Sequence, residues 1–237
     1  PTIQAAVDCA VAVDSANDTM IFVANGVYAE GRSPERGGNS RLVITNNIHI
    51  RSLNGADVTI IEGSGTNSLG TNAIRCVYID DGVLCGFTLR QGSSISTPGG
   101  GGGAYLAGRS PELRSCTVLN NKANYGGDGG GVYGGTLKNC TISGNTASGG
   151  LGGGAAQSLL MNCAISENRA ASGGGVNGSI LNNCVLIGNT ARYMGGGGYR
   201  SSMNSCKLIG NTVNADNGNE GGGGGAICTL KNCVLKE

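Results

Sequence analysis

Cysteines are the residues of this chain with the widest capacity for chemistry, and there are ten of them. An even number suits a set of disulfide bonds in an oxidising compartment. Six of the ten, however, follow one another at intervals of 24, 23, 21, 22 and 27 residues. These six are Cys116, Cys140, Cys163, Cys184, Cys206 and Cys233, and each lies in a Leu/Met-x-x-Cys-x-aliphatic unit. Such a repeat indicates one structural position rather than paired bridges.

We expect these six cysteines to be buried free thiols in a single inward register. Stacked neighbours would lie about as far apart as two strands, roughly 4.8 Å, which is slightly beyond the usual Cβ–Cβ distance of a disulfide. Cys9, Cys76, Cys85 and Cys228 lie outside the register and are better candidates for a bridge. No cysteine pair has the C-x-x-C spacing of a zinc site, so we assign no metal ligand.

An asparagine follows each complete unit, five residues after its cysteine. These residues are Asn121, Asn145, Asn168, Asn189 and Asn211. Amide side chains stacked in register can satisfy one another and the backbone where burial would otherwise be costly. The spacing therefore predicts an asparagine ladder at a turn.

Acid–base chemistry has one sequence candidate, the adjacent pair Asp80-Asp81, with Arg75 and Arg90 on either side. Clustered carboxylates could hold calcium, and an arginine could act as a base in a polysaccharide lyase. Asp-Asp-Gly between two apolar runs is also an ordinary turn sequence, and we favour the turn. We assign no catalytic, cofactor-binding or metal-binding residue.

Other polar and aromatic residues have structural explanations that compete with functional ones. His49 alternates with Ile48 and Ile50, so it is expected to face outward, and no acidic partner is in view. Tyr105, Tyr133 and Tyr199 each follow a glycine run and could stack as a ladder or contact sugar. The absence of Trp weakens the sugar interpretation.

Three loops are candidates for ligand contact. Residues 30–41 form the most polar insertion and could edge a groove, although a solvated loop is the simpler interpretation. Residues 212–221 contain Asn214, Asp216, Asn217 and Glu220 and could bind calcium weakly. The Gly-Gly-Asp-Gly sequence at 126–129 is similar to a calcium-binding repeat but occurs once.

The elements that position these residues follow from the repeat. Between the cysteine units lie runs of three to five glycines, which oppose the helix or Leu-rich return of a leucine-rich repeat. The alternative solenoid is a right-handed parallel β-helix, with two short strands in each coil. Because bulky side chains are scarce, with no Trp and two Phe, the core must be narrow. We therefore predict an all-β, right-handed parallel β-helix.

The N-terminal part departs from the regular repeat. Residues 2–13 carry apolar side chains at helical spacing and predict a short helix that covers the first coil. Strands are expected at 19–24, 41–45, 48–51, 58–61 and 74–79, and Phe87 occupies the cysteine position of an early unit. We predict a single β-helix domain over 1–237: a helical cap at 1–18, irregular first coils at 19–95 and regular Gly/Cys/Asn coils at 96–237.

Three segments give the chain a family resemblance: Thr2-Ile3-Gln4-Ala5-Ala6-Val7, Val23-Ala24-Asn25-Gly26-Val27-Tyr28 and Gly86-Phe87-Thr88-Leu89. Together with the Gly-rich Cys and Asn coils, they resemble bacterial right-handed β-helix proteins of the pectate-lyase-like superfamily. The pairing of Gly-Gly-Gly-Ala with x-x-x-Asn is similar to the repeats of chlamydial polymorphic outer-membrane proteins. The resemblance implies secretion or surface display, and the group includes both polysaccharide-cleaving enzymes and adhesins.

The net charge, the apolar stretches and the last repeat unit limit the kinds of partner that we expect. The net charge of +1 comes from 16 basic and 15 acidic scattered residues, so a nucleic-acid surface is not expected. No apolar stretch is long enough for a membrane span. The sequence ends within a repeat unit at Cys233-Val-Leu-Lys-Glu237, which predicts an open coil that could self-associate end to end, unless a longer natural chain continues it.

We therefore expect an extracellular structural or adhesin-like module, secreted or at the cell surface, without a cofactor. A cell-surface glycan is a further candidate partner. The alternative is a polysaccharide lyase or glycoside hydrolase acting on an acidic polysaccharide, which the fold alone cannot establish.

Overall fold

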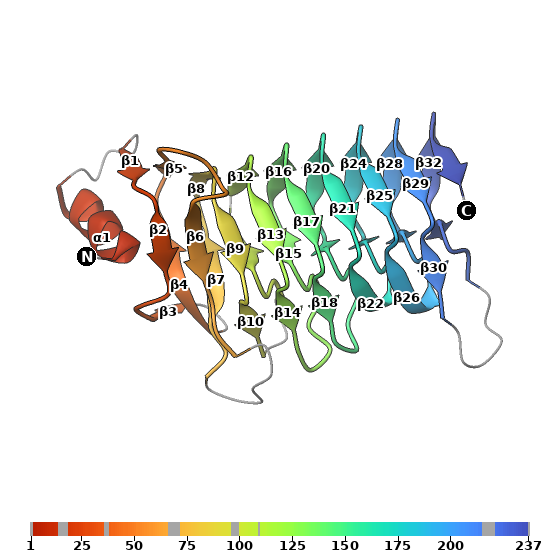
Figure 1. Cartoon of the computed structure of the whole chain (residues 1–237), viewed down its shortest axis with the longest axis horizontal. Coiled ribbons are helices and arrows are strands. Elements are labelled where there is room, and N and C mark those ends of the chain that lie inside the picture. The colour runs from red at the N-terminus through yellow and green to blue at the C-terminus, as the bar shows by residue number, and fades with distance from the viewer. Residues whose placement is uncertain are drawn as a thin grey trace.

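Equivalent strands of successive coils pair in parallel in the computed structural model, so each face of the coil becomes one sheet of a solenoid (Figure 1). The structure describes residues 2–13, 19–35, 38–65, 72–95, 100–108, 110–214 and 221–236. A regular coil runs through sheets C, A, B and D in that order. The prediction of an all-β parallel β-helix with an N-terminal helix is confirmed.

Sheets A and B carry the Leu and aliphatic positions of each repeat. Sheet A consists of β1 (Met20–Val23), β5 (Ile48–Ser52), β8 (Gly82–Cys85), β12 (Glu112–Arg114), β16 (Thr136–Lys138), β20 (Leu159–Met161), β24 (Ile180–Asn182), β28 (Ser202–Asn204) and β32 (Thr229–Lys231). Sheet B consists of β2 (Gly26–Tyr28), β6 (Thr59–Glu62), β9 (Thr88–Arg90), β13 (Thr117–Leu119), β17 (Thr141–Ser143), β21 (Ala164–Ser166), β25 (Val185–Ile187), β29 (Lys207–Ile209) and β33 (Val234–Lys236).

Sheets C and D form the other two faces. Sheet C consists of β3 (Ser33–Glu35), β4 (Gly38–Ile44), β7 (Arg75–Ile79), β11 (Ala104–Leu106), β15 (Val132–Gly134), β19 (Ala155–Ala156), β23 (Val176–Asn177), β27 (Gly198–Tyr199) and β31 (Gly225–Ala226). Sheet D consists of β10 (Ser93–Ser94), β14 (Lys122–Ala123), β18 (Thr146–Ala147), β22 (Arg169–Ser172), β26 (Thr190–Met194) and β30 (Thr212–Val213).

The predicted repeat unit accounts for the core. Leu113 on β12, Cys116 at the corner and Val118 on β13 are at most 1% exposed. The same three positions are buried in the following coils up to Met203, Cys206 and Leu208. Phe87 lies directly before Thr88, which pairs with Thr117, so it takes the cysteine position as expected. The interior is therefore a set of side-chain columns, each one residue wide.

The asparagine ladder is also confirmed, at the corner between sheets B and D. The backbone N–H and the side-chain Nδ2 of Asn145 both donate to Oδ1 of Asn168, at 2.9 Å each. The same pair of bonds joins Asn168 to Asn189 and Asn189 to Asn211. Each ladder side chain thus holds backbone groups of the preceding coil, while the next asparagine holds its own backbone N–H.

The glycine runs form the corner between sheets D and C, where the coil is thinnest. A Cβ on Gly174 would lie 2.4 Å from the carbonyl oxygen of Thr190 and 2.5 Å from that of Gly196. Any side chain there would collide with backbone, so the close approach of this corner to sheet D requires glycine.

The N-terminal helix α1 (Ile3–Val13) begins after Thr2, whose Oγ1 accepts a hydrogen bond from the backbone N–H of Ala5. The Gln4 side chain accepts from Val43 N and donates to Val43 O, so it pairs with backbone groups of β4 as a neighbouring strand would. Ile3 and Val7 pack into the core. The helix therefore covers the first coil, as predicted.

Two local expectations were wrong. Residues 30–41 are not simply a solvated loop, because β3 and β4 within this segment pair as an antiparallel hairpin. The three-residue strand β2 was not expected, although Gly26 and Val27 pair with β6. Within the described residues, no helix is long and apolar enough to span a membrane.

Candidate functional site

A groove on the outer face of sheet D is the most site-like feature of the described surface. Its volume is about 430 Å³. It crosses the strands β18, β22 and β26 and reaches Asn214 after β30. The lining residues are Thr146, Ala147, Ser148, Gly149, Arg169, Ala170, Ala171, Thr190, Ala191, Arg192, Tyr193 and Asn214. The groove thus spans several coils in the direction of the solenoid axis.

Unequal segment lengths explain why a hollow forms here. In each coil, one segment connects the ladder asparagine to the next glycine run. The segment with the fewest residues runs from Asn168 to Gly173. The equivalent segments in the two neighbouring coils, from Asn145 to Gly152 and from Asn189 to Gly195, contain more residues. The coil that contains β22 therefore recedes between neighbours that project further.

A β-bulge adds to this shape. Ala170 pairs with Ala191, but Ser172 pairs with Met194, so β26 holds one more residue than β22 over this stretch. Bulges re-aim side chains and are common beside binding sites. Here the extra residue leaves both Arg192 and Tyr193 exposed, and the Arg192 guanidinium lies 5.2 Å from the centroid of the Tyr193 ring.

The asparagine ladder holds the floor of the groove in place. Thr146, Arg169 and Thr190 each follow a ladder asparagine directly, and they pair in register across β18, β22 and β26. Their inward neighbours are buried alanines, among them Ala147 and Ala191. Rigid strands position side chains more accurately than loops do, so this arrangement favours a preformed binding surface.

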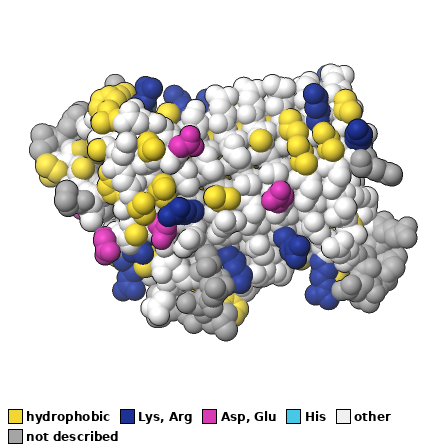
Figure 2. Space-filling model, in the orientation of Figure 1, with side chains coloured by type: hydrophobic (Ala, Val, Ile, Leu, Met, Phe, Trp, Pro, Cys, Tyr) yellow, Lys and Arg dark blue, Asp and Glu magenta, His cyan; other side chains and the backbone are white. Residues whose placement is uncertain are grey.

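The groove is cationic. Arg169 and Arg192 form no ion pair with any described residue, and the described lining contains no carboxylate. Lys122 precedes Thr146 in the same outward column of sheet D and is likewise unpaired. In Figure 2, Lys and Arg side chains are spaced along the part of this face where Figure 1 places sheet D. Hydroxyl and amide groups from Thr146, Ser148, Thr190 and Asn214 lie between the charges.

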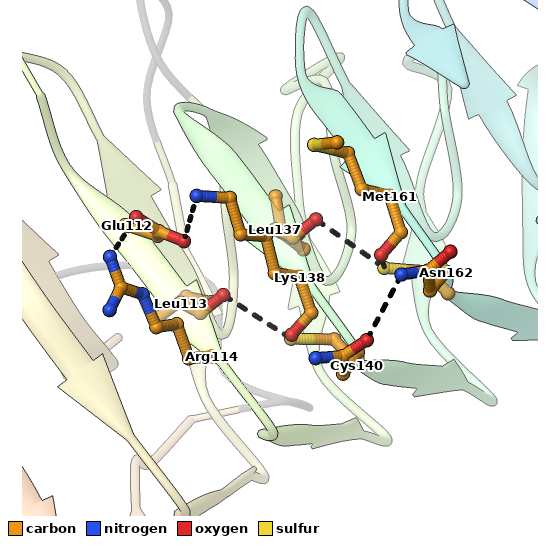
Figure 3. A network of polar contacts seen from close by, with 10 residues as sticks. Glu112, Leu113, Arg114, Leu137, Lys138, Cys140, Met161 and Asn162 are labelled. Carbon is orange, nitrogen blue, oxygen red and sulfur yellow. Dashed lines mark hydrogen bonds and ion pairs between the residues drawn. The ribbon is translucent and has the colours of Figure 1, made fainter. Parts of the chain in front are cut away.

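Two groups of charges on sheets A and B are neutralised. Glu112 on β12 lies 2.8 Å from Arg114 and 2.9 Å from Lys138, as Figure 3 shows. Burial would raise the pKa of Glu112, but the bonds to these two cations more than offset it, and the pKa is lowered. Glu62 and Arg90 form a second pair at 2.6 Å. The unpaired arginines of sheet D are therefore the more suitable anion site.

The acid–base candidate from the sequence is a turn. Asp80-Asp81 connects β7 to β8, as favoured, and the two arginines make their contacts elsewhere. Arg75 is buried and donates to the carbonyl oxygens of Gly101 and Gly100 at 2.9 and 3.0 Å. Arg90 bonds Glu62. The interpretation of these four residues as a lyase centre finds no support.

The cysteines are all free in the structure, so neither the ladder nor the four outlying residues form a disulfide. Burial raises the pKa of Cys76 and Cys116 to about 12 in each case. A thiol in that environment stays protonated and is a poor nucleophile or metal ligand. The ladder cysteines from Cys116 to Cys206 are buried in the hydrophobic core, so they act as core residues.

The tyrosine ladder differs from the expected one. Tyr78, Tyr105 and Tyr133 stack edge to face with ring centroids 5.5 Å apart. Tyr199 does not join them, because Ala156 and Asn177 occupy the same outward column between Tyr133 and Tyr199. Tyr199 instead lies 5.1 Å from the guanidinium of its neighbour Arg200. Tyr78 was predicted only as part of the strand at 74–79, not as part of the ladder.

The remaining candidates also have structural roles or lie outside the described residues. His49 is half-buried on the outer side of β5, as expected. Asp128 does not mark a calcium loop, because its Oδ1 accepts a hydrogen bond from Leu151 N in the next coil. Asp216, Asn217 and Glu220 lie outside the described residues. Among the residues that are described, no group of three His, Cys, Asp or Glu could hold a metal ion.

Fold and groove together define the class of this molecule: a parallel β-helix with a cationic groove along one face. No protein-family model matches the chain, and no curated protein matches it. Among solved structures, it is similar to the A-module of the mannuronan C-5 epimerase AlgE6 of Azotobacter vinelandii. The identity is 15%, the TM-score is 0.27, and the match covers 98% of this chain and 94% of that one. A likeness of this degree carries no information about activity or substrate.

Proposed function

We propose that this protein is an extracellular, adhesin-like β-helix module that binds an acidic glycan along the groove on sheet D and does not cleave it. The observation that carries the proposal is the pair of unpaired guanidinium groups, Arg169 and Arg192, in a groove without a described carboxylate. Guanidinium groups bind carboxylates in a two-pronged geometry that suits uronic acids.

The repeat of the fold suits a linear glycan. Successive strands of sheet D are about 4.8 Å apart, and a hexose unit of an extended polysaccharide has a similar length. One sugar unit can therefore face each coil as the glycan runs along the axis. The hydroxyl groups of Thr146, Ser148 and Thr190 provide donors and acceptors for sugar hydroxyls. The family resemblance to secreted β-helix proteins supports an extracellular location.

The alternative, a polysaccharide lyase or glycoside hydrolase, needs a general acid or base beside the bound glycan. The groove offers two arginines but, within its described lining, no carboxylate or histidine. Binding without turnover is therefore the better match to these residues.

Calorimetric titration with uronic-acid oligosaccharides and with neutral ones of equal length tests this proposal. We expect binding to the acidic glycan that weakens with added salt, because exposed charges are screened. Replacing both Arg169 and Arg192 by alanine should lower the affinity at least about tenfold. The matched control is Arg200→Ala, which removes an arginine with the same contact to a tyrosine but outside the groove.

Three outcomes would contradict the proposal. The neutral glycan could bind as tightly as the acidic one, or the double variant could bind like the control. Cleavage products of the glycan, resolved by chromatography after long incubation, would favour the enzymatic alternative.

End-to-end self-association is the second part of the proposal. Leu230 and Leu235 in the last described coil are 37% and 57% exposed, whereas their equivalents Met203 and Leu208 are 1% exposed. Any further coil placed against β32 and β33 would bury them, and a second copy is the source of it that we propose. Sedimentation velocity should show larger species as concentration rises, and Leu235→Lys should abolish them. Ile187→Lys, at an exposed position on the side of the solenoid, is the control. A monomer at all concentrations would contradict this part.

A further inference from the structure

The cations of sheet D are spaced in a way that specifies the glycan further, and this step rests on the proposed function. Lys122, Thr146, Arg169 and Thr190 occupy one outward column, because each is in register with the next. Along this column, a cation alternates with a hydroxyl group. Thr212 continues the column with a further hydroxyl, 3.3 Å from that of Thr190.

Lys122 and Arg169 are two coils apart, which is about 9.6 Å. If each coil faces one sugar unit, these two cations face units that are separated by one other unit. That intervening unit faces Thr146, which is neutral and suited to hydroxyl or amide groups. Arg192 lies on the next strand, β26, two residues after Thr190, which pairs with Arg169. It therefore flanks the acidic unit at Arg169 from the side.

We propose that the groove is selective for a linear glycan in which acidic and neutral sugars alternate, a uronate–N-acetylhexosamine disaccharide repeat. One acidic unit lies in the groove at Arg169 with Arg192, and the neutral unit lies beside it at Thr146. The second acidic unit lies at Lys122, on the strand next to the groove lining. A homopolymer of uronic acid places a carboxylate at the Thr146 position, where the strand β18 has no cation of its own to offset the lost hydration.

Competition binding with three oligosaccharides of equal length tests the selectivity: hyaluronan, polygalacturonate and dextran fragments. We expect hyaluronan fragments to bind at least about fivefold more tightly than polygalacturonate fragments, and dextran fragments not to bind. Lys122→Gln should lower the affinity for hyaluronan fragments about fivefold. Lys207→Gln removes an exposed lysine on sheet B, away from the column of sheet D, and is the control that should have no effect.

Thr146→Lys provides the converse test, because it places a cation at the neutral position. It should raise the affinity for polygalacturonate relative to hyaluronan. If native protein binds polygalacturonate as tightly as hyaluronan, or if Thr146→Lys leaves the ratio unchanged, the selectivity is contradicted while the proposed function stands. If neither acidic oligosaccharide binds, the proposed function fails as well.

Discussion

Asn168 shows, at the residue scale, how one side chain joins successive coils. Its Oδ1 accepts from the backbone and the side chain of Asn145, and its Nδ2 donates to Ile142 O and to Oδ1 of Asn189. The side chain is completely buried. A shorter or apolar residue would leave several buried groups without partners.

We therefore predict that Asn168→Ala lowers the free energy of unfolding by at least about 2 kcal/mol, because orphaned buried donors and acceptors cost about 1–3 kcal/mol each. Chemical denaturation followed by circular dichroism measures this. Thr141→Ala, at an exposed position on sheet B, should change stability by less than about 0.5 kcal/mol. Equal effects of the two substitutions would contradict the role of the ladder.

The buried thiols predict a dependence on alkaline pH. The pKa of Cys116 is raised from 9.0 to about 12 in the folded protein. The unfolded chain therefore loses this proton as the pH passes 9, while the folded chain keeps it, so unfolding releases a proton. Stability should be unaffected below pH 9 and fall by up to about 1.4 kcal/mol per pH unit above it for each such thiol. Melting temperatures across this range, compared with those of Cys116→Ala, check the slope. An identical slope in the variant would contradict it.

At the scale of elements, the parts that repeat were predictable and the parts that vary were not. The Leu, Cys, aliphatic and Asn positions recur in every regular coil, so their spacing gave the register, the core and the ladder. The groove lies in the segments between ladder asparagine and glycine run, which carry no shared pattern. The sequence signal for the groove was the unequal length of these segments, of which the one from Asn168 to Gly173 is the shortest. The hairpin at 33–44 was missed because polar residues there hide the pairing of β3 with β4.

The bulge in β26 gives the prediction that belongs to this scale. Deleting Tyr193 removes the extra residue and should realign β26 with β22, which removes the bend that sets the direction of the Arg192 side chain in the groove. The affinity for acidic glycan should then fall about tenfold, close to the effect of removing the arginines. Tyr193→Ala keeps the bulge and should lose much less. If the deletion and the substitution weaken binding equally, the bulge does not position Arg192.

The whole molecule is a one-dimensional stack in which each coil contacts mainly its neighbours. Its net charge is +1, yet the charges are unevenly distributed. Carboxylates such as Glu62 and Glu112 are paired with cations on sheets A and B, whereas Lys122, Arg169 and Arg192 remain unpaired on sheet D. A nearly neutral protein can thus present one cationic face, which the composition alone did not reveal.

Hydrogen–deuterium exchange with and without an acidic oligosaccharide locates the glycan-binding surface on the solenoid. We expect added protection confined to the groove, in peptides that contain residues 146–149, 169–171 and 190–193. Sheets A and B should exchange as before. Protection on those sheets instead, or none at saturating oligosaccharide, would contradict the assignment of the groove as the binding site.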